Sequence, residues 1–283
     1  PSPFIPNAFL FDGLTGSFVD LSTGSNIGIL NFSNQITMEA WVQPFSPTIG
    51  GSTRADIIAK GYDGTNEMTL RANGGYYSGG TYSDVTASGG ASGGLQTTDW
   101  THLVSTYDGT NWNLYVNSKL VGQSAVAGGA INFTAPWAIG DGTTGTAGGN
   151  SGNLRYFTGN ITEVALYTNA LTPAQVLNHF CVGELGTSSA SSRPIIITQP
   201  QPQTAAFGGT ATFSVEAVSA SSTTNQWYTN NVPIAGKTNA TLTVTNVSAG
   251  DVVNYSVLVG NSNGTTNSIS VSLTEVAANS LKW

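Results

Sequence analysis

Residues 101–122 read THLVSTYDGTNWNLYVNSKLVG, and this stretch decides the fold class. Apolar and polar residues alternate on both sides of the Asp108-Gly109 pair. The apolar residues of the second arm fall on one face: Trp112, Leu114 and Val116. Alternation with a period of two around an Asp-Gly pair predicts a β-hairpin. A second turn follows at 117–119, so we expect a meander whose apolar face must be covered by other strands.

The composition favours short strands and many turns. At 283 residues the chain is long enough for two domains, and only 8% of its residues are charged while 35 are glycine. The chain has eight basic and fifteen acidic residues and a pI near 4.5. This acidic balance does not favour binding to nucleic acid or anionic lipid. No apolar run reaches the roughly 18 residues of a membrane span, so membrane insertion is not expected. The low charge and the lack of a signal peptide favour a mature extracellular segment.

The clearest break is residues 184–194, ELGTSSASSRP, which are small, polar and closed by a proline. We therefore expect a first domain over 1–183, this linker, a second domain over 195–276 and a C-terminal tail over 277–283. One helix is expected at 172–180 (TPAQVLNHF), where Thr172 can cap and Pro173 suits the first helical position. All other periodic segments alternate as strands do, so the predicted class is all-β.

Two glycine-rich stretches, 73–94 and 140–153, interrupt the strands of the first domain. Neither opens a helix or has the spacing of a phosphate-binding loop. They are expected to be surface loops that serve either as floppy excursions or as binding loops. Cys181 is the only cysteine, which excludes an intrachain disulfide and predicts a small buried side chain.

Several motifs in order along residues 1–183 resemble the laminin-G-like, concanavalin-like jelly-roll family. They are AFLFDGLTGSFVDL, QITMEAWVQP, DIIAKG, WTHLVSTYDGTNWNLYVNSKLVG, WAIGD and GNITEVALYTNALTPAQV. The resemblance implies two packed antiparallel sheets with the opening hairpin at their centre. Members often carry an acidic residue where Thr162 stands, so the resemblance does not bring the family's calcium site with it.

Residues 195–276 resemble a bacterial immunoglobulin-like domain. Trp227 matches the buried tryptophan of the third strand, and Tyr255, after Asp251, matches the tyrosine corner. Val215 and Val257 stand at the two cysteine positions, which implies that Trp227 packs on aliphatic side chains. Such sandwiches have many unrelated roles, so this resemblance implies a fold and no activity.

No strand pairs two carboxylates on one face, as a jelly-roll glycosidase requires. Glu39 and Glu163 each stand alone in their strands, and a pair assembled across strands stays open. His102 and His179 have no nearby serine elbow or metal-ligand spacing, which favours structural or surface roles. We therefore expect no enzyme activity.

Aspartates at strand ends are candidate calcium ligands, although turns use the same residue. Asp63 and Asp141 are the better candidates among Asp12, Asp20, Asp63, Asp108 and Asp141, so calcium is a possible cofactor. Aromatic residues in or beside the glycine-rich loops are the candidate ligand-binding side chains, because aromatic faces stack on sugars. These are Tyr62, Tyr76, Tyr77, Tyr82, Trp137 and Tyr156. The alternative is that they pin the loops to the sandwich.

These patterns favour a non-enzymatic recognition or adhesion protein located outside the cell or on its surface. The partner is expected to be a glycan or an extracellular protein, bound where the two glycine-rich loops converge. The rival interpretation is a structural subunit of an extracellular assembly, such as a self-assembling surface filament or a decoration protein on a virion surface. If the tyrosines are exposed, they can form a binding surface; if they are buried, they belong to the core.

Overall fold

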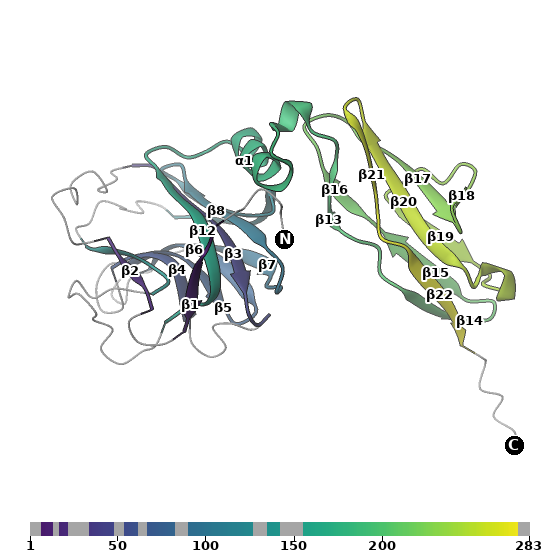
Figure 1. Ribbon diagram of the computed structural model, residues 1–283, viewed down its shortest axis with the longest axis horizontal. Coiled ribbons are helices and arrows are strands. Elements are labelled where there is room, and N and C mark those ends of the chain that lie inside the picture. Colours follow the sequence, from purple (N-terminus) through teal and green to yellow (C-terminus); the bar gives the residue numbers. More distant parts are fainter. Residues whose placement is uncertain are drawn as a thin grey trace, which may run out of the picture. The chain divides into compact units, whose positions relative to one another are not determined.

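The protein forms two compact units, Pro1–Leu185 and Gly186–Trp283. The computed structural model describes residues 7–13, 17–21, 34–47, 54–61, 67–82, 90–126, 135–141 and 155–276 (Figure 1). The boundary between the units falls inside the segment 184–194 that the sequence marks as a break.

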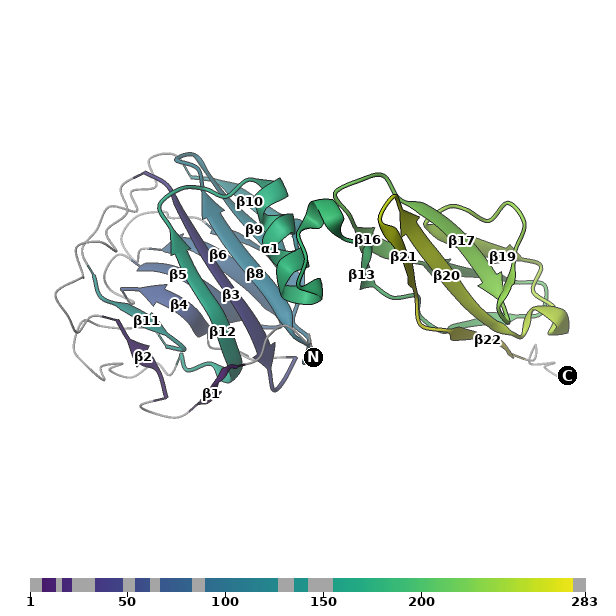
Figure 2. The ribbon, with the colours of Figure 1, turned by 45° about the horizontal axis from the view of Figure 1, so that its top comes forward.

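The first unit consists of two six-stranded sheets packed face to face, which is the predicted jelly-roll architecture (Figure 2). All its strand pairs are antiparallel. The first sheet contains, in spatial order, β1 (Phe9–Asp12), β12 (Thr158–Tyr167), β3 (Ile36–Pro44), β8 (Thr101–Tyr107), β9 (Asn111–Val116) and β10 (Lys119–Ala125). The second contains β2 (Val19–Asp20), β11 (Trp137–Ile139), β4 (Arg54–Lys60), β5 (Glu67–Asn73), β6 (Tyr76–Tyr82) and β7 (Gly90–Leu95).

The opening hairpin and the strand after it form β8–β9–β10, which confirms the predicted meander. The meander lies at one edge of the first sheet, however, and not at the centre as expected. Trp112 and Leu114 point into the core between the sheets and are fully buried. Tyr115, on the opposite face, packs with Val104 beneath the helix. Asp108 makes the first turn, because its carboxylate accepts hydrogen bonds from the backbone N–H groups of Thr110 and Asn111 at 2.8 and 2.7 Å.

The helix α1 (Pro173–Leu185) lies on the outer face of the first sheet (Figure 2). Thr172 caps it reciprocally with Gln175, since each side chain bonds the other's backbone N–H at 2.9–3.3 Å. The helix runs past the predicted end at residue 180, so 184 and 185 are helical and were wrongly placed in the linker. It stops at Gly186, whose φ of +67° fits the left-handed position that ends many helices. Within the described ranges no helix is long and apolar enough to cross a membrane.

The glycine-rich stretch 73–94 is largely sheet, so its prediction as a surface loop was wrong for the residues described. β6 and β7 pair with each other and extend the second sheet beyond β5. Glycine is used here for close approach: a Cβ on Gly93 would lie 2.5 Å from the carbonyl oxygen of Val121, and one on Gly122 would lie 2.4 Å from that of Ser92. β7 and β10 thus bring the two sheets together at one edge, where a side chain would not fit.

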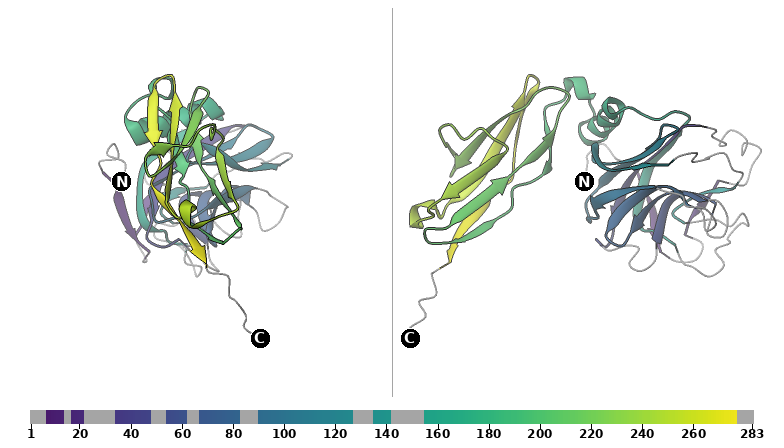
Figure 3. Two further views of the ribbon diagram at one scale, coloured as in Figure 1. Left: turned by 90° about the vertical axis from the view of Figure 1, so that its right-hand side faces the viewer. Right: turned by 180° about the vertical axis from the view of Figure 1, so that it is seen from behind.

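The second unit is a separate β-sandwich with its own core. Its strands are β13 (Ile195–Thr198), β14 (Gln203–Ala206), β15 (Thr210–Ser214), β16 (Glu216–Val218), β17 (Thr224–Thr229), β18 (Val232–Pro233), β19 (Thr241–Thr245), β20 (Asn254–Asn261), β21 (Gly264–Asn267) and β22 (Val271–Val276). β14 pairs with β22 in parallel, and β17, β20 and β22 run antiparallel in one sheet (Figure 3).

The core of the second unit confirms the immunoglobulin-like prediction. Trp227 is fully buried in the cluster that contains Val215 and Val257. The Tyr255 hydroxyl donates to the backbone oxygen of Asp251 at 3.1 Å, which is the tyrosine-corner hydrogen bond. Phe213 belongs to the same core and stacks on Tyr255 with ring centroids 4.7 Å apart.

Candidate functional site

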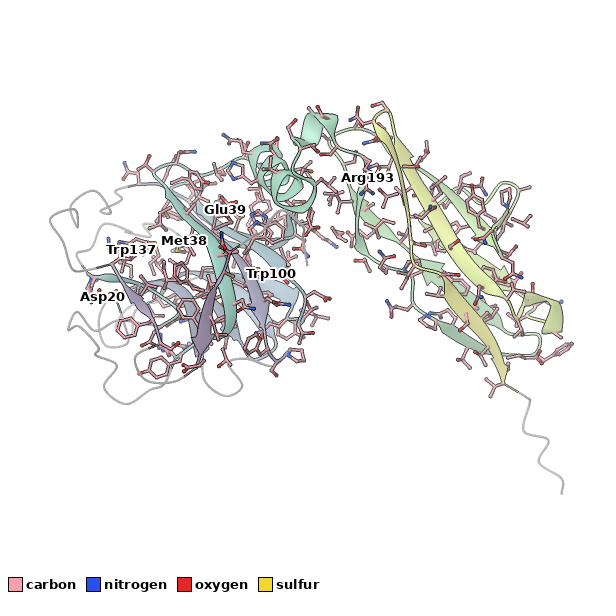
Figure 4. The ribbon with its side chains drawn as sticks, viewed as in Figure 1. Asp20, Met38, Glu39, Trp100, Trp137 and Arg193 are labelled. Atoms are coloured by element: carbon pink, nitrogen blue, oxygen red, sulfur yellow. The ribbon has the colours of Figure 1, made fainter. Side chains whose placement is uncertain are left out.

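Two predicted ligand-binding aromatics belong to the core, so their assignment to a binding surface was wrong. Tyr77 is fully buried, because it follows Tyr76 on β6 and successive strand residues face opposite sides of a sheet. Trp137, labelled in Figure 4, is 1% exposed on β11 and lies below the ammonium group of Lys60. Tyr62 and Asp63 lie outside the described residues, as does most of 140–153, so the expected convergence of the two loops is untested.

Two of the other predicted tyrosines, Tyr76 and Tyr82, lie on the outer face of the second sheet. Register places Arg54, Asn73, Tyr76 and Leu95 side by side across four strands. We call these four residues the end row. Tyr76 and Leu95 are 52% and 68% exposed, Asn73 is exposed and Arg54 is half-buried. The end row therefore presents a guanidinium, an amide, an aromatic ring and an aliphatic side chain in one line.

Buried hydrogen bonds hold the end row rigidly. The Gln96 side chain, 4% exposed, donates to the backbone oxygen of Tyr76 at 2.7 Å, and its own backbone N–H donates to Gly75 at 2.8 Å. Gly74 and Gly75 have φ of +63° and +93°, which lets β5 return tightly as β6 beside the row. Tyr76 is thus an exposed ring on an ordered strand rather than on a mobile loop.

Next to the end row lies a buried charged network on the same outer face. Arg71 donates to Glu67 at 2.5 Å, and Arg155 donates to Glu67 at 2.7 Å and approaches Asp56 at 3.6 Å. All four side chains are at most 3% exposed. Asp56 and Glu67 approach the same Arg155 nitrogen, so neighbouring strands bring together two carboxylates that the sequence shows no sign of pairing.

With Asp141, whose charge acts on Asp56, the network holds three carboxyls and two guanidiniums. Burial raises the pKa of Asp56 to about 7; the two arginines oppose this shift, while Glu67 and Asp141 add to it. With a pKa of about 7, the Asp56 carboxyl is about half protonated at neutral pH, and burial is the main cause. Asp141, 2% exposed, is therefore part of this electrostatic cluster.

Tyr82 covers the network from its outer side. Its ring centre lies 3.8 Å from the central guanidinium carbon of Arg71, a stacked cation–π contact. Arg71 also donates to the Ser78 hydroxyl at 3.4 Å. Tyr156, next to Arg155 in sequence, is half-buried. Of the six predicted aromatics, the structure gathers Tyr76 and Tyr82 on this face.

Among the described residues no group of three His, Cys, Asp or Glu side chains has the arrangement of a metal site. Asp108 and Asp12 engage in turns, since Asp108 accepts backbone hydrogen bonds and the Asp12 N–H donates to Ser17 at 3.0 Å. Thr162 donates to the Asn7 carbonyl at 2.5 Å. Calcium binding involving Asp63 and Asp141 therefore stays a prediction.

A second polar cluster, on the first sheet, was also missed from the sequence. Glu39 was expected to stand alone, yet it is bonded by both histidines: His102 at 2.7 Å and His179 at 3.0 Å. These residues are separated by 63 and 140 positions in the chain, so no local spacing indicates the contact.

Comparison with known proteins decides the family of the first unit. The family model of the concanavalin A-like lectin/glucanases superfamily (Laminin_G_3) matches residues 15–177. The chain belongs to this superfamily. No curated protein matches the chain.

Similar solved structures include two carbohydrate-binding domains. The CBM40 domain of a Ruminococcus gnavus sialidase bound to α2,3-sialyllactose has 15% identity and a TM-score of 0.49 over 62% of this chain and 98% of that one. Domain 4 of AbnA, an extracellular arabinanase from Geobacillus stearothermophilus, has 22% identity and a TM-score of 0.43 over 62% and 78%. Tandem Ig repeats of Dlar match 30% of this chain with 21% identity and a TM-score of 0.28, and the match spans 49% of their length.

Proposed function

We propose that the first unit is a non-enzymatic glycan-binding domain that acts outside the cell, with the end row as its contact surface. The observation that carries the proposal is Tyr76, an aromatic ring more than half exposed on an ordered strand between polar side chains. Aromatic faces stack on sugar rings, while amide and guanidinium groups bond hydroxyls. Membership of a superfamily of lectins and glucanases supports this class of ligand.

The absence of catalysis is part of the proposal. A glycosidase needs one carboxyl acid and one carboxylate that both reach the sugar. Asp56 and Glu67 have suitable chemistry but are 0% and 2% exposed, and Glu67 is bonded to both arginines. Because both carboxyl groups are buried and Glu67 is engaged by arginines, we assign Asp56 and Glu67 a structural role beneath the end row and not a catalytic one.

A glycan array followed by titration calorimetry of the intact chain tests the binding function. Tyr76→Ala should weaken the best array ligand about tenfold, the equivalent of roughly 1.4 kcal/mol. Phe9→Ala is the matched control, because Phe9 is 72% exposed on β1 of the other sheet. Equal loss in both variants, or no glycan bound at all, contradicts the proposal.

The second unit is proposed to act as a spacer or second adhesive module. Its described residues form a compact hydrophobic core, and this core does not indicate a class of ligand. A chain that binds no glycan and instead forms regular oligomers in analytical ultracentrifugation would favour the structural-subunit interpretation.

A further inference from the structure

A pocket of about 340 Å³ opens between α1 and the outer face of the first sheet. Its lining includes Glu39 and Trp41 from β3, Glu163 and Tyr167 from β12, and His179 and Gly183 from α1. We call it the helix pocket. It lies on the opposite sheet from the end row, and its volume is at the small end of the range for ligand sites, enough for one compact molecule.

Glu39, labelled in Figure 4, forms the floor of the helix pocket. Glu39 is 6% exposed and accepts hydrogen bonds from His102 and His179. Burial acts to raise the pKa of Glu39, but hydrogen bonds and charge from the two histidines outweigh it and lower the pKa below its usual value. Burial and the Glu39 charge raise the pKa of Tyr167 to about 12.

The rim carries a second carboxylate in an unusual conformation. Glu163 has a backbone φ of +49°, a left-handed value that residues other than glycine and asparagine rarely adopt. It stands in a β-bulge, where pairing with β3 skips between Thr162 and Ala165. Bulges re-aim side chains near functional sites, and such strain is retained where the surroundings impose it. Within the described part of the chain, the exposed Glu163 carboxylate has no hydrogen-bond or ion-pair partner.

The walls are aromatic and closely fitted. Trp41 stacks on Phe180 of α1 with centroids 5.7 Å apart, and Tyr167 lies 5.7 Å from the His179 ring. A Cβ on Gly183 would lie 2.4 Å from the Trp41 ring, so only glycine lets the helix approach. The lining holds two carboxylates, the His179 imidazole and two large rings, but no lysine or arginine.

We propose that the helix pocket binds a small organic ammonium ion, with Glu163 as its ionic anchor and the Trp41 and Tyr167 rings as its wall. A protonated amine offers hydrogen bonds to a carboxylate and is attracted to the negative face of an aromatic ring. The Glu39 carboxylate, fixed by its hydrogen bonds to His102 and His179, adds attraction without needing to move. This pocket does not depend on the end row or on glycan binding.

The test uses n-butylammonium, with n-butanol as a neutral probe of the same size, titrated into the intact chain at pH 8. At this pH an alkylammonium keeps its charge. Binding is followed by ligand-observed NMR and by the Trp41 indole N–H resonance, identified with Trp41→Phe. We expect saturable millimolar binding of n-butylammonium and at least tenfold weaker binding of n-butanol.

Two variants at one position separate charge from structure. Glu163→Gln should weaken n-butylammonium at least tenfold by removing the charge-assisted bond. Glu163→Gly should do the same with an unchanged melting temperature, because glycine accepts the positive φ. Glu275→Gln, in the second unit, is the charge control and should leave binding unchanged. Equal affinity for both probes, no saturable binding, or full binding by Glu163→Gly overturns the proposal; glycan binding by the end row is unaffected by any of these results.

Discussion

Replacing Asp56 by asparagine should make the first unit more stable at pH 8 and remove most of its pH dependence above pH 4. Asp56 is fully buried, and its pKa rises from 3.8 to about 7. Between these two values the unfolded chain has lost the proton that the folded chain keeps, so the free energy of unfolding falls as pH rises and levels off above about 7. A shift of roughly three pH units corresponds to about 4 kcal/mol.

Asparagine has the size of the protonated acid and cannot ionise, so Asp56→Asn should match the wild type near pH 4. At pH 8 it should be more stable by up to about 4 kcal/mol, because no carboxylate must then be buried beside Glu67 and Asp141. The remaining network has two carboxylates and two guanidiniums and stays balanced.

The assay is urea unfolding from pH 4 to 8, read by hydrogen-exchange mass spectrometry of peptides from β4 and β5. This readout separates the first unit from the second. Asp99→Asn is the control, since Asp99 is exposed in the segment before β8. If Asp56→Asn is instead less stable than the wild type at pH 8, Asp56 acts as an ionised partner of Arg155 and the charge balance argued above is wrong.

Three further perturbations have defined outcomes. Tyr77→Ala should lower the free energy of unfolding of the first unit by about 3–5 kcal/mol, whereas Tyr76→Ala should change it by less than about 0.5 kcal/mol, both by urea titration. Trp227→Ala should destabilise the second unit by about 3–5 kcal/mol in the same assay, because it empties the core and removes the indole bond to the Asn239 carbonyl at 2.9 Å. Glu39→Gln should cost about 2 kcal/mol at pH 7, and the difference should shrink as pH falls below 4.5, since a lowered carboxyl pKa stabilises only above that range; an undiminished difference at pH 3 would contradict this.

Local alternation predicted the strands well because it records burial directly. The opening hairpin was visible as a period-two pattern, whereas the two sheets and the immunoglobulin-like core were expected from the family resemblances, the latter through marker residues such as Trp227 and Tyr255. The same rule failed at 73–94, where glycine replaces the apolar residues that would have shown the alternation. Gly93 is required there by a neighbouring backbone rather than by flexibility, and nothing in the local sequence indicates that neighbour.

The candidate sites were harder to predict because their members come from distant segments. Arg155 is 88 positions from Glu67, and His179 is 140 positions from Glu39. Paired site residues can be predicted from sequence when they alternate along one strand, and neither of these pairs lies on one strand. For Tyr76 and Tyr77 the sequence did contain the answer: adjacent strand residues cannot both face a ligand, once the segment is known to be a strand.

The buried network and the end row are connected through strand register. Arg54, Asn73 and Tyr76 stand side by side only in the observed pairing of β4, β5 and β6, and a slip of one residue would turn Tyr76 toward the core. Glycine and small side chains in β6 and β7 specify register weakly. Arg71 meets Asp56 on one side and Ser78 on the other, in the row of residues next to the end row. Buried ion pairs contribute little net stability, but they do penalise wrong pairings, because a slipped strand leaves a charge unpaired. The network therefore fixes which side chains the end row presents. Arg71→Met leaves the buried Glu67 carboxylate without one of its two partners, so it should lower the free energy of unfolding of the first unit by about 3–5 kcal/mol in urea titration and weaken glycan binding as well.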